Sequence, residues 1–222
     1  MKNYLNERGN IAIFVLGMLS IIMVMFILVI NMASALATKE QSSTTVQQAS
    51  LAATSVFYEE VSRVIDEYED ETLEGSLLAF FEDFNEKVSD RVDQLSSSEG
   101  YTGWSQNEIN IEAFNQVLTE ELNEPIVRTT LRGLLQDEEV RTSVINEARN
   151  TIQRNNGVLD GAVLTVSDNR FYVRAANEFE STSLDGIVGQ INEHVYQESA
   201  GPTINFLELI WPSSSSTIPL DH

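Results

Sequence analysis

The side chains that most often carry out catalysis are scarce in this chain. Its 222 residues include no cysteine and two histidines, His194 and His222. Without cysteine, disulfides, thiol catalysis and thiolate metal sites are excluded, and two histidines are too few for a histidine-based metal cluster. A serine–histidine–aspartate site would have to use His194. His194 follows Glu193 in a segment with helical spacing, so we expect it to be a surface or interface residue.

Carboxylates, in contrast, are abundant, with 34 Asp and Glu against 13 Lys and Arg and a net charge of −21. Among so many acids, pairs close in sequence arise by chance and do not indicate a glycosidase-type site. The densest run, residues 66–71, lacks the alternating pattern and central glycine of a calcium loop. Phosphate-binding, hydrolase and zinc-protease motifs are also missing. We therefore expect no enzymatic activity, no cofactor, no metal and, because of the charge, no nucleic-acid partner.

The stretch that positions everything else is residues 11–36, about 26 residues without a charged side chain. At about 1.5 Å per residue it is longer than a hydrocarbon core of about 30 Å. In lipid the backbone polar groups must be satisfied internally, so we expect a transmembrane helix. Its one amide side chain, Asn31, lies near the outer interface and could hydrogen-bond a neighbouring helix. Neither Gly nor Pro occurs between Gly17 and Gly75, so the helix should continue as a stalk over residues 37–72.

The charges that flank this stretch predict its orientation. Lys2 and Arg8 precede it, whereas Lys39 is the only base just after it and is followed at once by Glu40. The positive-inside rule then places residues 1–10 in the cytoplasm and the acidic remainder outside. A cleaved signal peptide is the alternative, since cleavage after Ala37 would release a secreted domain. The apolar run is longer than the usual signal-peptide core of about 7–15 residues, which favours a retained anchor.

The first 55 or so residues resemble a known family. Residues 7–14 are ERGNIAIF, an apolar run follows, and residues 37–41 (ATKEQ) and 46–53 (VQQASLAA) come after it. This order is similar to the N-terminus of the TadE/TadG-like proteins of Tad (Flp-type) pilus assembly. The resemblance implies a membrane-anchored, pseudopilin-like or accessory structural protein of a Tad-like pilus or secretion apparatus. It also implies a single pass through the bacterial cytoplasmic membrane and other apparatus subunits as partners.

The same resemblance bears on processing of the N-terminus. In processed members a prepilin peptidase cuts after a glycine, and a glutamate is the fifth residue of the mature chain. Gly9 would be that glycine here, but the fifth residue after it is Phe14, and residues 10–36 contain no acid. This departure favours the unprocessed, TadG-like type over a subunit that packs in a filament.

Apolar residues continue along the predicted stalk in steps of three and four, which indicates one apolar face of a helix. Two interpretations are open: the face packs against the chain's own domain, or it docks on another stalk, as in a bundle of pilins. The residues concerned are Val46, Ala49, Ala53, Val56, Phe57, Val61, Val64 and Tyr68.

Residues 73–210 should form an α+β head that is mostly helical, giving a pilin-like layout overall. We expect helices over 73–95, 106–123, 126–135 and 137–153, the second opened by a capping box of Ser105 and Glu108. The pattern then predicts a β-hairpin of 162–166 and 170–175, a third strand through 178–180, a helix over 184–198, a last strand over 203–210 and a flexible tail over 211–222. Besides the structural role, a single-pass extracytoplasmic binding or sensing module fits this organisation, as does a secreted domain released by cleavage after Ala37.

Overall fold

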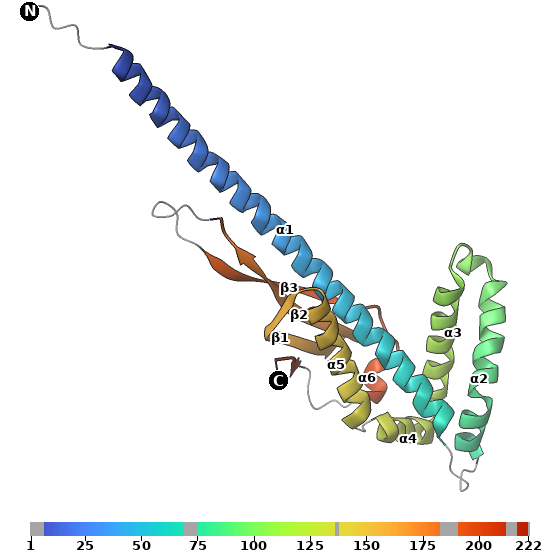
Figure 1. Ribbon diagram of the computed structural model, residues 1–222. Helices are drawn as coiled ribbons and strands as arrows, with labels where there is room; N and C mark the ends of the chain where they lie inside the picture. The colour runs from blue at the N-terminus through green and yellow to red at the C-terminus, as the bar shows by residue number, and fades with distance from the viewer. Residues whose placement is uncertain (1–6, 69–74, 136–137, 183–190, 212–216, 222) are drawn as a thin grey trace, which may run out of the picture.

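The computed structural model describes residues 7–68, 75–135, 138–182, 191–211 and 217–221. These residues form a mostly helical α+β protein with one long N-terminal helix and a four-stranded antiparallel sheet (Figure 1). The expected fold class is confirmed.

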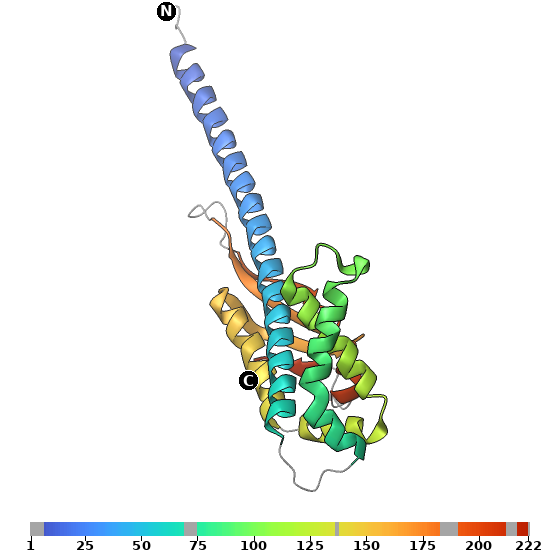
Figure 2. The same cartoon turned by 90° about the vertical axis from the view of Figure 1, so that its right-hand side faces the viewer.

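The longest element is helix α1, Glu7–Glu67, which runs for 61 residues without a break (Figure 1). No residue after Gly17 interrupts it, because its polar stretch is rich in Ala, Gln and Ser rather than Gly or Pro. The first part of α1 extends beyond the rest of the molecule, and the second part lies across the sheet (Figures 1 and 2). The expected stalk is therefore continuous with the expected membrane helix, and it ends at Glu67.

Two helices, α2 (Gly75–Ser96) and α3 (Gln106–Glu121), form an antiparallel hairpin joined through a short 3-10 turn, η1 (Glu99–Tyr101). The predicted capping box begins α3: Ser105 Oγ accepts a hydrogen bond from the Glu108 N–H at 3.3 Å, and Glu108 Oε2 accepts one from the Ser105 N–H at 2.7 Å. Phe84 and Phe114 join the two helices with ring centroids 5.3 Å apart.

Two further helices follow α3 in the chain. Helix α4 (Pro125–Leu135) begins with proline, which lacks the N–H that a first helical turn leaves unpaired anyway. Helix α5 (Glu138–Arg154) lies beside α1, and together they cover one face of the sheet (Figures 1 and 2).

The sheet consists of β1 (Gly157–Ser167), β2 (Arg170–Glu180), β3 (Asn192–Ala200) and β4 (Thr217–Pro219) in the order β3-β2-β1-β4, with every pairing antiparallel. The predicted β1–β2 hairpin is present. Asp168 and Asn169 form its turn with φ of 51° and 56°, which short polar residues tolerate. The expected third strand at 178–180 is a continuation of β2.

The predicted helix over 184–198 is wrong in the part that the structure describes. Residues 192–200 form β3, and the whole length of β3 pairs with β2, for example Val195 with Asn177. The helical spacing that suggested a helix was therefore outweighed by pairing with the free edge of β2. This pairing is a non-local contact, which a local sequence pattern does not contain. The residues with that spacing are Ile187, Val188, Ile191 and Val195. Residues 183–190 lie outside the described part of the chain.

The end of the chain also differs from expectation. The predicted strand over 203–210 is replaced by α6 (Leu207–Ile210), a single turn whose apolar side chains enter the core. Within the expected flexible tail, Trp211 and Leu220 are buried, and β4 pairs with β1. An apolar segment can fill a core as a strand or as one helical turn, and the sequence alone does not distinguish them.

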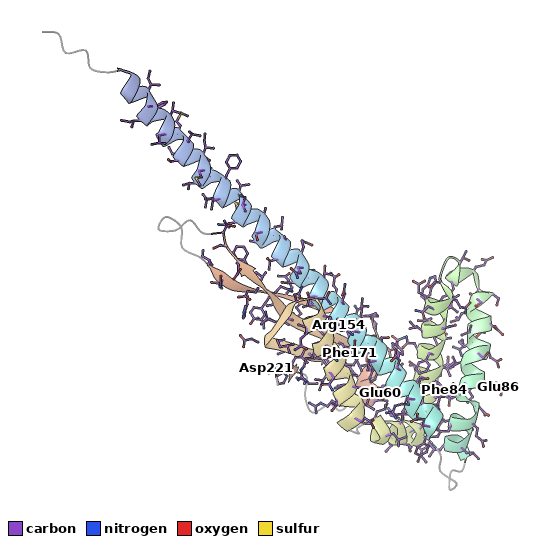
Figure 3. All side chains as sticks on the ribbon, in the orientation of Figure 1. Glu60, Phe84, Glu86, Arg154, Phe171 and Asp221 are labelled. Atoms are coloured by element: carbon purple, nitrogen blue, oxygen red, sulfur yellow. The ribbon has the colours of Figure 1, made fainter. Side chains whose placement is uncertain are left out.

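The core lies between α1, the sheet and the neighbouring helices, and a group of aromatic rings lies within it. Phe57 of α1 contacts the rings of Phe171, Phe206 and Trp211, with centroids 5.4, 6.1 and 5.8 Å away. Figure 3 shows Phe171 on the sheet beneath α1. Large rings from β2 and from the two ends of α6 therefore hold the second part of α1 to the head.

Candidate membrane anchor and stalk interface

The first candidate site is the exposed apolar part of α1. From residue 11 to residue 30 every side chain is exposed except Val24, which is half-buried, and Ile27, which is buried. Figure 3 shows these side chains projecting in all directions from a helix that stands clear of the head. The helix is long and apolar enough to cross a membrane. A helix that is apolar on every side and, apart from Val24 and Ile27, uncovered by its own chain favours an apolar environment.

Asn31 is where α1 first bonds to the head. Its Nδ2 donates to the carbonyl of Thr182 at 3.1 Å, and its Oδ1 accepts from the N–H of Thr182 at 2.7 Å. The side-chain amide thus pairs with both backbone groups of one residue that lies just after β2. The expectation that Asn31 could bond a neighbouring helix is answered differently here, because its partner is this chain's own head.

The predicted stalk stripe lies inside this chain's core. Val46, Ala49, Ala53, Phe57 and Val61 are fully buried, and the other three members of the stripe are half-buried. Most of them pack towards the sheet and α5, and Tyr68 at the end of the stripe packs on Phe81 of α2. Of the two interpretations, packing on the chain's own domain describes their position. Docking this stripe on another stalk would require the head to leave α1.

Small polar residues extend the buried face of α1 towards its N-terminus. Ser42 Oγ accepts from the N–H of Asn177 at 3.0 Å, and Thr45 Oγ1 donates to Asn177 Oδ1 at 3.0 Å. The Asn177 amide nitrogen in turn donates to the carbonyls of Asn155 and Asn156 at 3.0 and 2.9 Å. One buried asparagine thus joins α1, β2 and the end of α5, with its polar groups satisfied.

Sequence reasoning missed this polar extension because it followed apolar residues only. The available signal was the spacing of Thr38, Ser42 and Thr45, which continues the helical period of the stripe upstream of Val46. Small side chains also allow close approach. A Cβ built on Gly201 would lie 2.6 Å from Thr54 Oγ1 and 3.0 Å from the carbonyl oxygen of Ser50.

A groove of about 750 Å³ lies between the outer face of α1 and helix α3. Its apolar lining includes Leu51, Trp104 and Ile111, which are 52%, 45% and 40% exposed. Glu59 and Glu112 also line it, and none of the described lining residues is a Lys, Arg or His. The groove therefore combines an apolar floor with negative charge.

Tyr58 lies at the base of this groove. Its hydroxyl donates to Asn115 Oδ1 at 2.9 Å, and its ring packs on Phe114 and Phe206. Burial raises the pKa of Tyr58 to about 12, because the phenolate would lose its hydration. The side chain is consequently a neutral donor that links α1 to α3.

The remaining residues singled out in the sequence are dispersed. Gly9 lies in the first turns of α1, and Ala37 lies in the same helix between Asn31 and Ser42, both of which bond to the head. Cleavage after either residue stays a prediction. His194 lies in β3, not in a helix, with Nδ1 3.8 Å from Asp160. In the described ranges, no three His, Asp or Glu side chains are grouped so as to hold a metal ion.

Comparison with known proteins bears on the N-terminal part of the chain. Residues 9–56 match a family model named Tad and described as Flp pilus-assembly TadE/G-like. No curated protein and no solved structure matches the chain. The match covers about a fifth of the sequence and falls entirely within α1. Over the helix that leaves the head, this chain is similar to the TadE/G-like proteins of Flp pilus assembly, as the sequence indicated.

Proposed function

We propose that this chain is a pseudopilin-like accessory structural protein that anchors an extracytoplasmic head for a Tad-like pilus or a related secretion apparatus. The family match and the exposed apolar helix fit a pilus-associated membrane protein. The finer proposal rests on one observation: the family match covers the same residues as two structural features of α1. These features are its exposed apolar segment and the turns after it that bind the head.

The proposed topology has the N-terminus in the cytoplasm and the head outside the cell. Lys2 and Arg8 support this direction through the positive-inside rule. The missing acid after Gly9 supports an unprocessed anchor. The role proposed is structural, without enzymatic activity or a cofactor.

The stalk contact with other subunits is proposed at the groove between α1 and α3, since the buried stripe is occupied by the head. The occupant that fits is a basic amphipathic segment of another subunit. Its apolar side chains would cover Leu51, Trp104 and Ile111, and its Lys or Arg would meet Glu59 and Glu112. A second copy of this chain fits less well, because each copy carries a net charge of −21.

Deletion of the gene followed by electron microscopy of the cells tests the role. Surface filaments should be lost and should return when the full chain is supplied from a plasmid. Wild-type filaments in the deletion strain would refute the proposed function.

Complementation with Ile111→Lys tests the groove, because the added cation lies on its apolar floor. We expect this variant to be folded but to restore few or no filaments. Leu78→Lys is the matched control, since Leu78 is 37% exposed on α2 and does not line the groove. Equal restoration by both variants would contradict the groove as the contact.

N-terminal sequencing of the cellular protein separates the alternatives: Met1 indicates a retained anchor, Asn10 a processed pseudopilin and Thr38 a secreted domain.

A further inference from the structure

The two edges of the sheet are built differently. Strand β4 forms one edge with the three residues Thr217–Pro219, and its last residue, a proline, has no N–H. Strand β3 forms the other edge with the nine residues Asn192–Ala200, none of which is Pro or Lys. Short strands, proline and lysine are among the usual means by which proteins prevent an edge from pairing with another chain. The β4 edge uses the first two of these means, and the β3 edge uses none of the three.

The hydrogen bonds at the two ends of β3 show which of its backbone groups point outwards. The N–H of Ser181 donates to the carbonyl of Ile191 at 2.9 Å, and the N–H of Gly201 donates to the carbonyl of Phe171 at 2.8 Å. The register between these bonds is constant, so the odd-numbered residues of β3 bond to β2. The N–H and C=O groups of the even-numbered residues therefore face away from the sheet. The central ones, called the open edge below, belong to His194, Tyr196 and Glu198.

The open edge has no strand beside it in the part of the chain that the structure describes. There β3 pairs with β2 alone, and none of its residues is buried. The carbonyl of Tyr196 accepts a hydrogen bond at 2.6 Å from Nε2 of Gln197, the next residue. A backbone N–H of an incoming strand can replace this flexible side chain. The edge therefore offers alternating donors and acceptors to a further strand.

Strand β3 runs in the same direction as α1. Thr182, which follows the residue paired with the start of β3, bonds to Asn31 of α1. Gly201, which follows the end of β3, lies against Ser50 further along α1. Two copies paired through antiparallel β3 strands would therefore hold their α1 helices in opposite directions, and a parallel pair, whose bonds are staggered, does not close on a two-fold axis. Two anchors in one membrane are thus incompatible with a symmetric β3 pair, a step that rests on the proposed membrane anchorage.

Charge narrows the choice of occupant further. Strand β3 contains Glu193 and Glu198 but no Lys or Arg, and the neighbouring Arg174 of β2 lies over the ring of Tyr196, 4.2 Å from its centroid. Opposite charges on paired strands stabilise a sheet, and like charges destabilise it. We propose that the open edge of β3 binds an extended basic segment of another subunit, which adds a strand to the sheet. Backbone hydrogen bonds hold the segment, and its Lys or Arg side chains lie opposite Glu193 and Glu198.

Proline substitution tests the open edge in cells, because it removes an outward N–H without removing a bond to β2. In the gene-deletion strain, His194→Pro should restore few or no filaments, whereas His194→Thr, which keeps the N–H, should restore them. Thr217→Pro makes the same change at the other edge, since Leu220 of β4 bonds to Ala162 of β1 and Thr217 therefore faces outwards. It should also restore filaments. Chemical denaturation in detergent checks that each variant is folded. Equal restoration by His194→Pro and His194→Thr would overturn the proposal.

Amide exchange of the unsubstituted full chain tests the edge without filaments, so it separates this proposal from the proposed function. The chain in detergent micelles is mixed with an excess of a synthetic peptide of alternating Thr and Val with a Lys near each end. Deuterium exchange at the N–H groups of His194, Tyr196 and Glu198 should slow several-fold, because these groups become hydrogen-bonded. The same peptide N-methylated at the residues that face β3 should change nothing. Equal exchange with both peptides would overturn the proposal. Slowing that grows with the concentration of the chain alone would also overturn it, in favour of a second copy.

Discussion

The two halves of α1 have the same backbone geometry but opposite relations to the rest of the molecule. In the first half apolar side chains surround the helix and nearly all of them are exposed, as with Ile13 at 71%. In the second half most of them follow one face, which the head covers, as with Val46 at 0%. The comparison teaches that the distribution of apolar residues around the axis, rather than their presence, decides whether this helix is covered by the rest of the chain.

The largest effect should come from removing the ring that holds the second half to the head. Phe57→Ala deletes a buried side chain that contacts three other rings, so the free energy of unfolding should fall by about 3–5 kcal/mol. Chemical denaturation in detergent micelles measures it. Leu51→Ala on the exposed face of the same helix is the control and should change stability by about 0.5 kcal/mol or less. Similar losses for both would contradict the difference between the two faces.

A charge in the first half should affect insertion and not folding. Leu19 lies near the middle of residues 11–30, and Leu19→Lys should disfavour insertion by about 2.5–3.5 kcal/mol. The fraction of protein recovered in alkaline-washed membranes should therefore fall, while the denaturation midpoint of the head stays unchanged. Gln48→Lys adds the same charge to an exposed position of the second half and should alter neither. Unchanged recovery of Leu19→Lys would count against a transmembrane helix.

Two glycines offer a sharper test of close packing in the second half. Gly201→Ala would place a Cβ 2.6 Å from Thr54 Oγ1, and the resulting shift of α1 should reduce stability by about 1–3 kcal/mol. Gly133→Ala in α4 meets nothing within 4 Å and should stabilise the head by up to about 1 kcal/mol through helix propensity. Thermal unfolding of both variants should shift in opposite directions. Shifts in the same direction would show that α1 is not closely packed at Gly201.

The smallest effect concerns Tyr58 at high pH. Its pKa is about 12 in the folded chain and about 10 when unfolded, so between these values the unfolded chain loses its proton first. The contribution of Tyr58 to stability is then complete below pH 10 and is lost as the pH rises to about 12. Tyr58→Phe should flatten this decline and weaken the head by about 1 kcal/mol at neutral pH, because the bond to Asn115 is lost. Denaturation series at several pH values measure both, and an identical slope in the variant would contradict the assignment.

Local sequence features predicted the elements whose causes are local. The capping box of Ser105 and Glu108 begins α3, and the Asp168–Asn169 turn joins β1 to β2. Strands β3 and β4 were not predicted, because each depends on an edge supplied by a distant segment. The long apolar helix was predictable for the same reason as the cap, since its cause is a continuous run of apolar residues in the sequence.

The stalk interface was predictable only in part. Its apolar members follow a clear helical period, but Ser42 and Thr45 resemble surface residues until Asn177 is placed opposite them. The groove could not be predicted from any local sequence pattern. It forms only where residues 51–62 of α1 lie beside residues 104–115, and the chain reverses direction twice between these two stretches.

The unbroken course of α1 has a mechanical consequence. Because α1 runs from the exposed apolar segment to Phe57 without a loop, a load on the head would pass along hydrogen-bonded turns and not through a slack tether. Torque about the helix axis would be transmitted in the same way, so that a rotation of the head would also rotate the exposed apolar segment of α1.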